Sequence, residues 1–141
     1  MATTRHASTH WEGSLMEGAG RVTLESSGLG THDVTWASRA NDPEGRTSPE
    51  ELIAAAHSSC FSMALSHALA QAGTPAASLD TSAAVTFQPG EGITGIHLTV
   101  RGNVPGISAE AFAEAAANAK AGCPVSKALT GTTITLDAAL A

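Results

Sequence analysis

Residues 47–65 read TSPEELIAAAHSSCFSMAL, and this stretch decides the fold. Its first residues carry the signals of a helix start: Ser48 suits the N-cap, Pro49 suits the first helical position, and Glu51 completes a capping box. Nothing interrupts the helical pattern until Gly73, a residue type that commonly follows a helix end. We therefore predict one long helix over residues 49–72, roughly 36 Å from end to end.

Almost every face of this predicted helix is apolar, which is typical of a helix that is buried on all sides. Two small sheets of the same chain would cover part of it, and a second layer of helix has to cover the rest. The simplest second layer is the same helix from another copy in a two-fold dimer. The alternative is the second predicted helix of the chain, residues 109–121. We expect the dimer.

Alternating apolar residues, Gly- and Pro-rich turns and helix caps predict the other elements. Residues 1–10 are expected to form a frayed tail and residues 39–47 a surface loop. The predicted strands are 11–16, 21–25, 33–37, 83–87, 93–104 and 132–136, and the other predicted helices are 109–121 and 124–129. This order predicts a single α+β domain over residues 1–141 with antiparallel sheets.

Composition argues against several classes of protein. A formal net charge of −6, with only seven Lys and Arg residues, argues against nucleic acid or an anionic membrane as a partner. The start of the chain has no apolar run of signal-peptide length, and the acids and histidines of the central helix favour a protein core over a membrane span. Two cysteines are too few for a disulfide scaffold. We therefore expect a cytoplasmic protein in which any disulfide is transient.

The two cysteines are the first candidates for chemistry. Cys60 lies in the middle of the central helix, beside serines that are poor choices for a purely apolar seam. Cys123 lies between the helix-ending Gly122 and the helix-starting Pro124, so it should occupy an N-cap, where amides and the helix dipole favour a thiolate. The alternative for both is a small residue without a function. If the two thiols meet, one can attack an oxidant and the other can resolve the product.

A buried reactive thiolate needs a fixed positive charge, because burial alone raises the pKa of a thiol. Arg39 is well placed to reach inward, and Arg21 and Arg46 are the alternatives. Glu50 is left free by the capping box, and it lies ten residues before Cys60, about 15 Å along one helix. We infer that Glu50 can serve Cys60 only across an interface between antiparallel copies. The alternative for each of these charged residues is an ordinary solvated side chain without a catalytic role.

His57 lies one helical turn before Cys60, so a Cys–His hydrolase is an alternative, although a hydrogen-bonded core histidine is the commoner use. Two histidines and the two cysteines can also be written as a metal set (His57, His67, Cys60 and Cys123), but no ligand-pair spacing supports it. We expect no metal and no cofactor.

Several motifs spread over nearly the whole chain belong together. They are HWEG at 10–13, PEELIAAAH at 49–57 leading to CFSMALS at 60–66, VPGI at 104–107, AGCPVS at 121–126 and ITLD at 134–137. With these motifs the chain resembles the OsmC/Ohr family of thiol-dependent peroxidases, specifically its OsmC (osmotically inducible protein C) branch. The resemblance implies an intertwined homodimer, with two long central helices packed back to back and antiparallel sheets on either side.

The resemblance also implies a function and a site. The function is reduction of organic hydroperoxides, and more weakly of hydrogen peroxide, in oxidative and osmotic stress defence, with an external dithiol of the lipoyl or thioredoxin type as reductant. Cys60 matches the peroxidatic cysteine of the family and Cys123 matches the resolving one. Glu50 matches the glutamate that holds the catalytic arginine at the subunit interface. Arg39 matches that arginine in the OsmC branch, and Arg21 lies nearer the position used in the Ohr branch.

We therefore predict that Cys60 attacks a hydroperoxide, that its sulfenic acid condenses with Cys123, and that the dithiol resets the pair. Apolar walls that favour organic peroxides are predicted from four side chains of the central helix: Leu52, Ile53, Phe61 and Met63. The alternative function is a non-catalytic dimeric stress protein or small-ligand binder with two structural cysteines.

Overall fold

The central helix predicted from the sequence is present. In the computed structural model, which describes residues 1–141, α2 runs from Pro49 to Gln71, and Gly73 follows it with a φ of 86° that suits glycine. The hydroxyl of Ser48 accepts a hydrogen bond from the backbone N–H of Glu51 (3.1 Å), as in a helix cap. The capping box is incomplete, because the carboxylate of Glu51 accepts from the hydroxyl of Thr47 (2.6 Å) instead.

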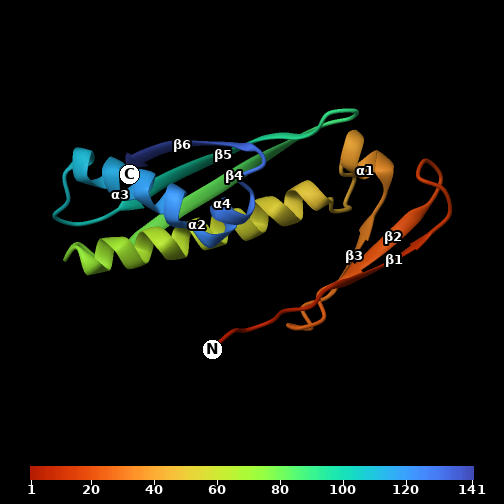
Figure 1. Cartoon of the computed structure of the whole chain (residues 1–141), viewed down its shortest axis with the longest axis horizontal. Coiled ribbons are helices and arrows are strands. Elements are labelled where there is room, and N and C mark those ends of the chain that lie inside the picture. The colour runs from red at the N-terminus through yellow and green to blue at the C-terminus, as the bar shows by residue number, and fades with distance from the viewer. The chain divides into compact units, whose positions relative to one another are not determined.

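The chain forms two compact units, Met1–Leu52 and Ile53–Ala141, and α2 passes from the first into the second (Figure 1). The first unit holds an antiparallel sheet of three strands in the order β1 (Ser8–Glu12), β2 (Ala19–Thr23) and β3 (Thr31–Val34), followed by helix α1 (Trp36–Ala40). Trp11 stands opposite Gly20 in this sheet. A Cβ on residue 20 would come within 2.6 Å of the Trp11 indole, so the register requires a glycine there.

Two predictions for the first unit are wrong. β1 begins at Ser8, inside the expected frayed tail, and it ends at Glu12 because Gly13, with a φ of 89°, turns the chain. Helix α1 replaces the end of the third predicted strand and the start of the predicted loop. Its cause is a local capping box, in which Thr35 and Ser38 exchange two hydrogen bonds between side chain and backbone, each 3.0 Å.

The second unit holds the other sheet, in the order β4-β5-β6. Strands β4 (Ser78–Gln88) and β5 (Gly92–Asn103) form a long antiparallel hairpin, whereas β6 (Thr133–Leu140) pairs with β5 in parallel. The prediction of antiparallel sheets is therefore correct for the first sheet and for this hairpin, and wrong for β6. Between β5 and β6 the chain crosses through α3 (Ala109–Gly122) and α4 (Pro124–Ala128), and such crossovers join parallel strands.

The core of the second unit lies between its helices and one face of its sheet. From His57 onward every fourth residue of α2 is buried along one stripe, and alternate residues of β5 are buried as well; these are His57, Phe61, Leu65 and Leu69 on α2 and Ile96, Leu98 and Val100 on β5. On the opposite side of α2 the side chains of Ala55, Ser59, Met63, Ser66 and Ala70 are exposed. The α+β class is confirmed, and the chain by itself covers one side of its central helix.

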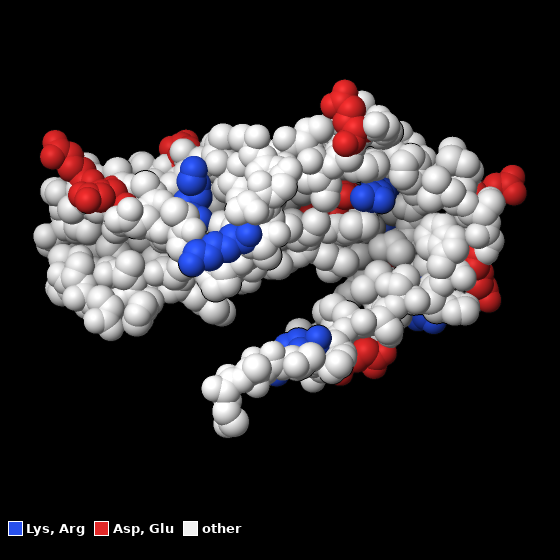
Figure 2. Space-filling model, viewed as in Figure 1, with Lys and Arg blue, Asp and Glu red and all other residues white.

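The surface carries few charges. Figure 2 shows Lys, Arg, Asp and Glu side chains scattered over the face in view, with most of that face formed by other residues. By length and composition alone, α2 would also pass for a membrane span, as the core helices of water-soluble proteins do.

Candidate active site

Cys60 and Cys123 meet in the second unit, although 63 residues separate them in the chain. Their Sγ atoms are 3.1 Å apart, within hydrogen-bond contact. Both are free thiols; Cys60 is half-buried, and Cys123 is fully buried. Since an S–S bond is about 2.05 Å long, the sulfurs have only about 1 Å to travel to form a disulfide. The arrangement is suited to reversible thiol–disulfide chemistry.

The local structure explains why the second sulfur sits where it does. Cys123 ends α3 and occupies the N-cap of α4, with Pro124 in the first turn, as the sequence predicts. Its side chain makes no regular capping hydrogen bond. The backbone N–H groups of Val125 and Ser126 nevertheless act on the sulfur, because the open N-terminus of a helix favours negative charge.

The surroundings shift the pKa values of the two thiols in opposite directions. Burial acts most strongly on Cys123 and would raise its pKa, but hydrogen bonds from the backbone of Ser126, from Cys60, from the Ser126 hydroxyl and from the backbone of Val125 together outweigh it, and the pKa falls. Burial first, and then the hydrogen bond with Cys123, raise the pKa of Cys60. Within one chain, these surroundings therefore favour the neutral thiol of Cys60.

The first unit brings the predicted arginine and glutamate together. Arg39 comes from α1 and Glu50 from the first turn of α2, and the guanidinium donates to both carboxylate oxygens: Nε to Oε1 at 3.0 Å, Nε to Oε2 at 3.2 Å and Nη2 to Oε2 at 2.9 Å. The Glu50 side chain is 9% exposed and that of Arg39 is 30% exposed. A two-pronged pair of this kind fixes the direction in which the guanidinium points.

The alternative arginines have different surroundings. Arg21 lies 3.6 Å from Asp33 in a pair whose side chains are 70% and 65% exposed, and Arg46 is exposed. Of the three candidates, Arg39 is the one held against a buried carboxylate. The catalytic roles predicted for Arg39 and Glu50 remain predictions.

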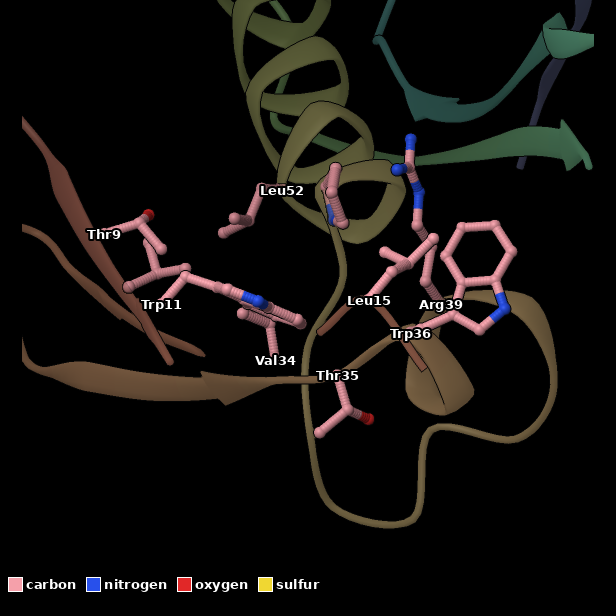
Figure 3. Close-up of a pocket in the computed structure, with 10 residues that line it drawn as sticks. Thr9, Trp11, Leu15, Val34, Thr35, Trp36, Arg39 and Leu52 are labelled. Carbon is pink, nitrogen blue, oxygen red and sulfur yellow. The ribbon is translucent and has the colours of Figure 1, made fainter. Parts of the chain in front are cut away.

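A cavity of about 370 Å³ opens in the first unit beside Arg39 (Figure 3). Its wall is mostly apolar and is formed by side chains of the sheet, of α1 and of the start of α2: Thr9, Trp11, Leu15, Val22, Val34, Thr35, Trp36, Arg39, Pro49 and Leu52. In Figure 3, Trp11 of β1 and Leu52 of α2 extend into the same space. The contribution of the two tryptophans was not predicted, because only the paired strands bring Trp11 near α1.

The four predicted wall residues do not gather in one place. Leu52 lines the cavity of the first unit, whereas Ile53 lines a smaller hollow of the second unit with residues of β5 and of the segment after α4. Phe61 is fully buried in the core, and Met63 is 72% exposed on the free side of α2. Their predicted role in substrate binding remains a prediction.

His57 makes its contact with α4 rather than with Cys60. Its Nε2 lies 2.7 Å from the hydroxyl of Ser126, both side chains are buried, and its Nδ1 is buried without a hydrogen-bond partner. Sequence reasoning did not find this pair, since 69 residues separate the two positions. No three His, Cys, Asp or Glu side chains of the chain gather closely enough to hold a metal ion.

A half-buried thiol and a buried thiol at disulfide-forming distance, on an α+β fold, define a dithiol redox site. The family described as OsmC-like protein matches residues 41–137, and the chain belongs to this family. It is 44% identical over 140 residues to the peroxiredoxin OsmC of Escherichia coli (strain K12), which covers 97% of this chain and 96% of that protein. The peroxiredoxin OsmC of Shigella flexneri matches equally well.

Solved structures share the fold. The organic hydroperoxide resistance protein OsmC of Legionella pneumophila superimposes with a TM-score of 0.75 at 24% identity, over 99% of this chain and 98% of that one. The organic hydroperoxide resistance protein OhrB of Bacillus subtilis gives a TM-score of 0.67 at 23% identity, over 96% and 98% of the two chains. The expected family and the expected α+β fold of the chain are therefore confirmed.

Proposed function

We propose that this protein is a cysteine-based peroxidase that reduces organic hydroperoxides to alcohols, and hydrogen peroxide more weakly, in oxidative and osmotic stress defence. The observation that carries the proposal is the pair of free thiols 3.1 Å apart, in a chain 44% identical to a protein named peroxiredoxin. The reaction needs no cofactor, because the sulfurs themselves carry the two electrons.

The chemistry runs in three steps. The Cys60 thiolate attacks the distal oxygen of ROOH, so that an S–O bond forms, the O–O bond breaks and the alkoxide leaves as the alcohol after taking up a proton. The Cys123 thiolate then attacks the sulfur of the sulfenic acid, and hydroxide leaves as the S–S bond forms. An external dithiol of the lipoyl or thioredoxin type finally reduces the disulfide by exchange and is itself oxidised to a disulfide.

The first step needs a cation near Cys60, since burial and Cys123 both raise the pKa of that thiol. Glu50 lies on the same helix, ten residues before Cys60, which is about 15 Å along its axis. We therefore assign the task to the Arg39–Glu50 pair of a second copy, whose guanidinium would lie beside Cys60 and favour its thiolate. Arg21 and Arg46 are the alternatives that mutation has to exclude.

Two observations support the homodimer with back-to-back central helices. One side of α2 is exposed and consists mostly of small residues, with Met63 72% exposed among them. In addition, the first unit buries no apolar side chain within one chain, and Trp11, Leu15 and Met16 are exposed there. A sheet without a buried apolar face is marginal alone, so a second copy that covers both surfaces would stabilise the fold. The chain would then act as one functional domain over residues 1–141.

The apolar cavity supports the choice of organic hydroperoxides. Its lining of two tryptophans, aliphatic side chains and one guanidinium suits a molecule with an apolar body and a polar end. We propose that Leu52 forms part of this wall and that Ile53, Phe61 and Met63 complete the apolar surroundings in the dimer. We also propose a cytoplasmic location, because the mechanism requires a reducing compartment.

Counting thiols tests the proposal. One equivalent of cumene hydroperoxide should remove two free thiols per chain from the reduced protein within seconds. In the Cys123→Ser variant it should remove one thiol and leave a sulfenic acid on Cys60 that dimedone traps; the matched control, Cys60→Ser, should lose none. If the thiols of the unmodified protein persist through minutes of exposure, the protein is a binder with structural cysteines and the proposal is wrong.

A further inference from the structure

A buried polar pair adjoins the dithiol on the side of the core. His57 on α2 is fully buried and Ser126 on α4 is 4% exposed, and their side chains are 2.7 Å apart. Ser126 lies three residues after Cys123, in the first turn of the helix that Cys123 caps. Burying an imidazole among apolar side chains costs free energy, and here one ring nitrogen remains unpaired as well. The proposed peroxide step makes no use of this pair.

The direction of the hydrogen bonds follows from the number of protons. Burial lowers the pKa of His57 and so favours the neutral ring, which carries one proton. If that proton is on Nδ1, a buried N–H has no acceptor and the Ser126 hydroxyl is turned towards the ring. If it is on Nε2, the ring donates to Ser126, whose own proton is free to reach the sulfur of Cys123. A thiolate on Cys123 favours the second arrangement, because hydrogen bonds to charged groups are the stronger ones.

Exposure decides which sulfur of the disulfide a reductant attacks. Cys123 is fully buried, whereas Cys60 is half-buried. An incoming thiolate therefore attacks the sulfur of Cys60 and forms a mixed disulfide there. The S–S bond breaks, and its electron pair stays on Cys123, which has to leave as a thiolate. The second thiol of the reductant then attacks the mixed disulfide and releases Cys60.

We propose, building on the function proposed above, that His57 and Ser126 are positioning residues that hold the Ser126 hydroxyl proton on the sulfur of Cys123 and thereby make Cys123 the leaving thiolate during reduction. The pair acts on the reductive half of the cycle, in which the Arg39–Glu50 pair has no assigned part. The lowered pKa of Cys123, to which the Ser126 hydroxyl contributes, is consistent with this role.

Two pairs of variants separate the hydrogen bonds from the packing. Ser126→Ala removes the hydroxyl and Ser126→Thr retains one; His57→Leu removes the donor at similar volume and His57→Gln supplies an N–H near the position of Nε2. The matched control is His97→Leu, which removes the other His–hydroxyl pair of the chain, the exposed contact of His97 with Thr135 at 2.6 Å. The disulfide is formed with diamide, so that no peroxide is needed, and its reduction by dithiothreitol is followed in a stopped-flow instrument.

We expect Ser126→Ala and His57→Leu to slow reduction of the disulfide about tenfold, because each removes one hydrogen bond that supports the charged sulfur. Ser126→Thr and His57→Gln should retain most of the unmodified rate. In a Cys60→Ser background, titration of the thiolate absorbance should show the pKa of Cys123 raised by about one unit in the first two variants. The His97→Leu control should match the unmodified protein in both measurements.

Two outcomes would overturn the inference: reduction at the unmodified rate in Ser126→Ala and His57→Leu, even with a lowered Tm, or an equal loss in Ser126→Ala and Ser126→Thr. The first would make the pair an ordinary core contact, and the second would show that volume matters and the hydroxyl does not. Because the disulfide is made with diamide, a failure of the proposed peroxidase function would appear separately, as thiols that persist in cumene hydroperoxide.

Discussion

Replacing Arg39 by alanine should first of all cost stability. The change leaves the Glu50 carboxylate, 9% exposed, without the guanidinium that now donates to it at 3.0, 3.2 and 2.9 Å. Removal of one partner from a fully buried pair costs about 3–5 kcal/mol, but Arg39 is 30% exposed and water screens part of the interaction. We therefore expect a loss of about 1–2 kcal/mol in the free energy of unfolding, measured in urea at fixed protein concentration.

The same change should slow the chemistry. If the guanidinium of a second copy supports the Cys60 thiolate, its removal should raise the pKa of Cys60 by about one unit or more and cut the thiolate fraction near neutral pH about tenfold. The pKa is read from the thiolate absorbance in a Cys123→Ser background, and the peroxide step from the second-order rate with cumene hydroperoxide. Arg39→Lys should give a pKa and a rate between those of the unmodified protein and of Arg39→Ala, because lysine keeps the charge and loses the two-pronged contact.

Arg21→Ala is the matched control for both measurements. Its partner Asp33 is 3.6 Å away and both side chains are mostly exposed, so we expect a change below about 0.5 kcal/mol and no change in the rate. The reasoning is refuted if Arg21→Ala raises the pKa of Cys60 and Arg39→Ala leaves it unchanged. A loss of stability without a change in the pKa would leave the ion pair with a structural role alone.

Three further results are expected. Gly20→Ala should lower the free energy of unfolding by about 1–3 kcal/mol in urea, because its Cβ would come 2.6 Å from the Trp11 indole; an unchanged midpoint would contradict the sheet register. Met63→Glu should convert the proposed dimer into monomers, as measured by light scattering. A dimer that stays intact would mean that this side of α2 is not the interface. In Cys60→Ser, the free energy of unfolding should rise with pH between the lowered pKa of Cys123 in the folded protein and its ordinary value near 9.0, because in this range the unfolded chain binds more protons. This gain should be lost as the pH falls through the folded-state pKa. The double variant Cys60→Ser/Cys123→Ser should show no such gain.

Local signals gave correct predictions where neighbouring residues decide the structure. The start of α2 at Pro49 and the N-cap position of Cys123 depend on the few residues around them, and both are found where the sequence places them. The error at α1 is of the same local kind, since Thr35 and Ser38 form a capping box that the strand pattern concealed. At this position the two hydrogen bonds of the capping box favour a helix turn over the strand that the apolar pattern predicts.

Local sequence patterns did not predict the contacts between segments that are distant in the chain. The parallel pairing of β6 depends on the path of α3 and α4, and the cavity beside Arg39 depends on where the strands carry Trp11. The pairing of His57 with Ser126 is of the same kind. Each of these joins residues whose separation along the chain says nothing about their separation in space.

Helix caps, apolar periodicity and short motifs involve neighbouring residues, so the amino-acid sequence was enough to predict the long central helix, the α+β class, the family and the residue types of the site. The distance of 3.1 Å between the two sulfurs and the bidentate contact of Arg39 with Glu50 depend on the packing of segments that are distant in the chain. The tertiary structure also decided that Cys123 is the buried partner of the pair of thiols. These are consequences of how helices and sheet pack, and packing is set by the whole chain at once.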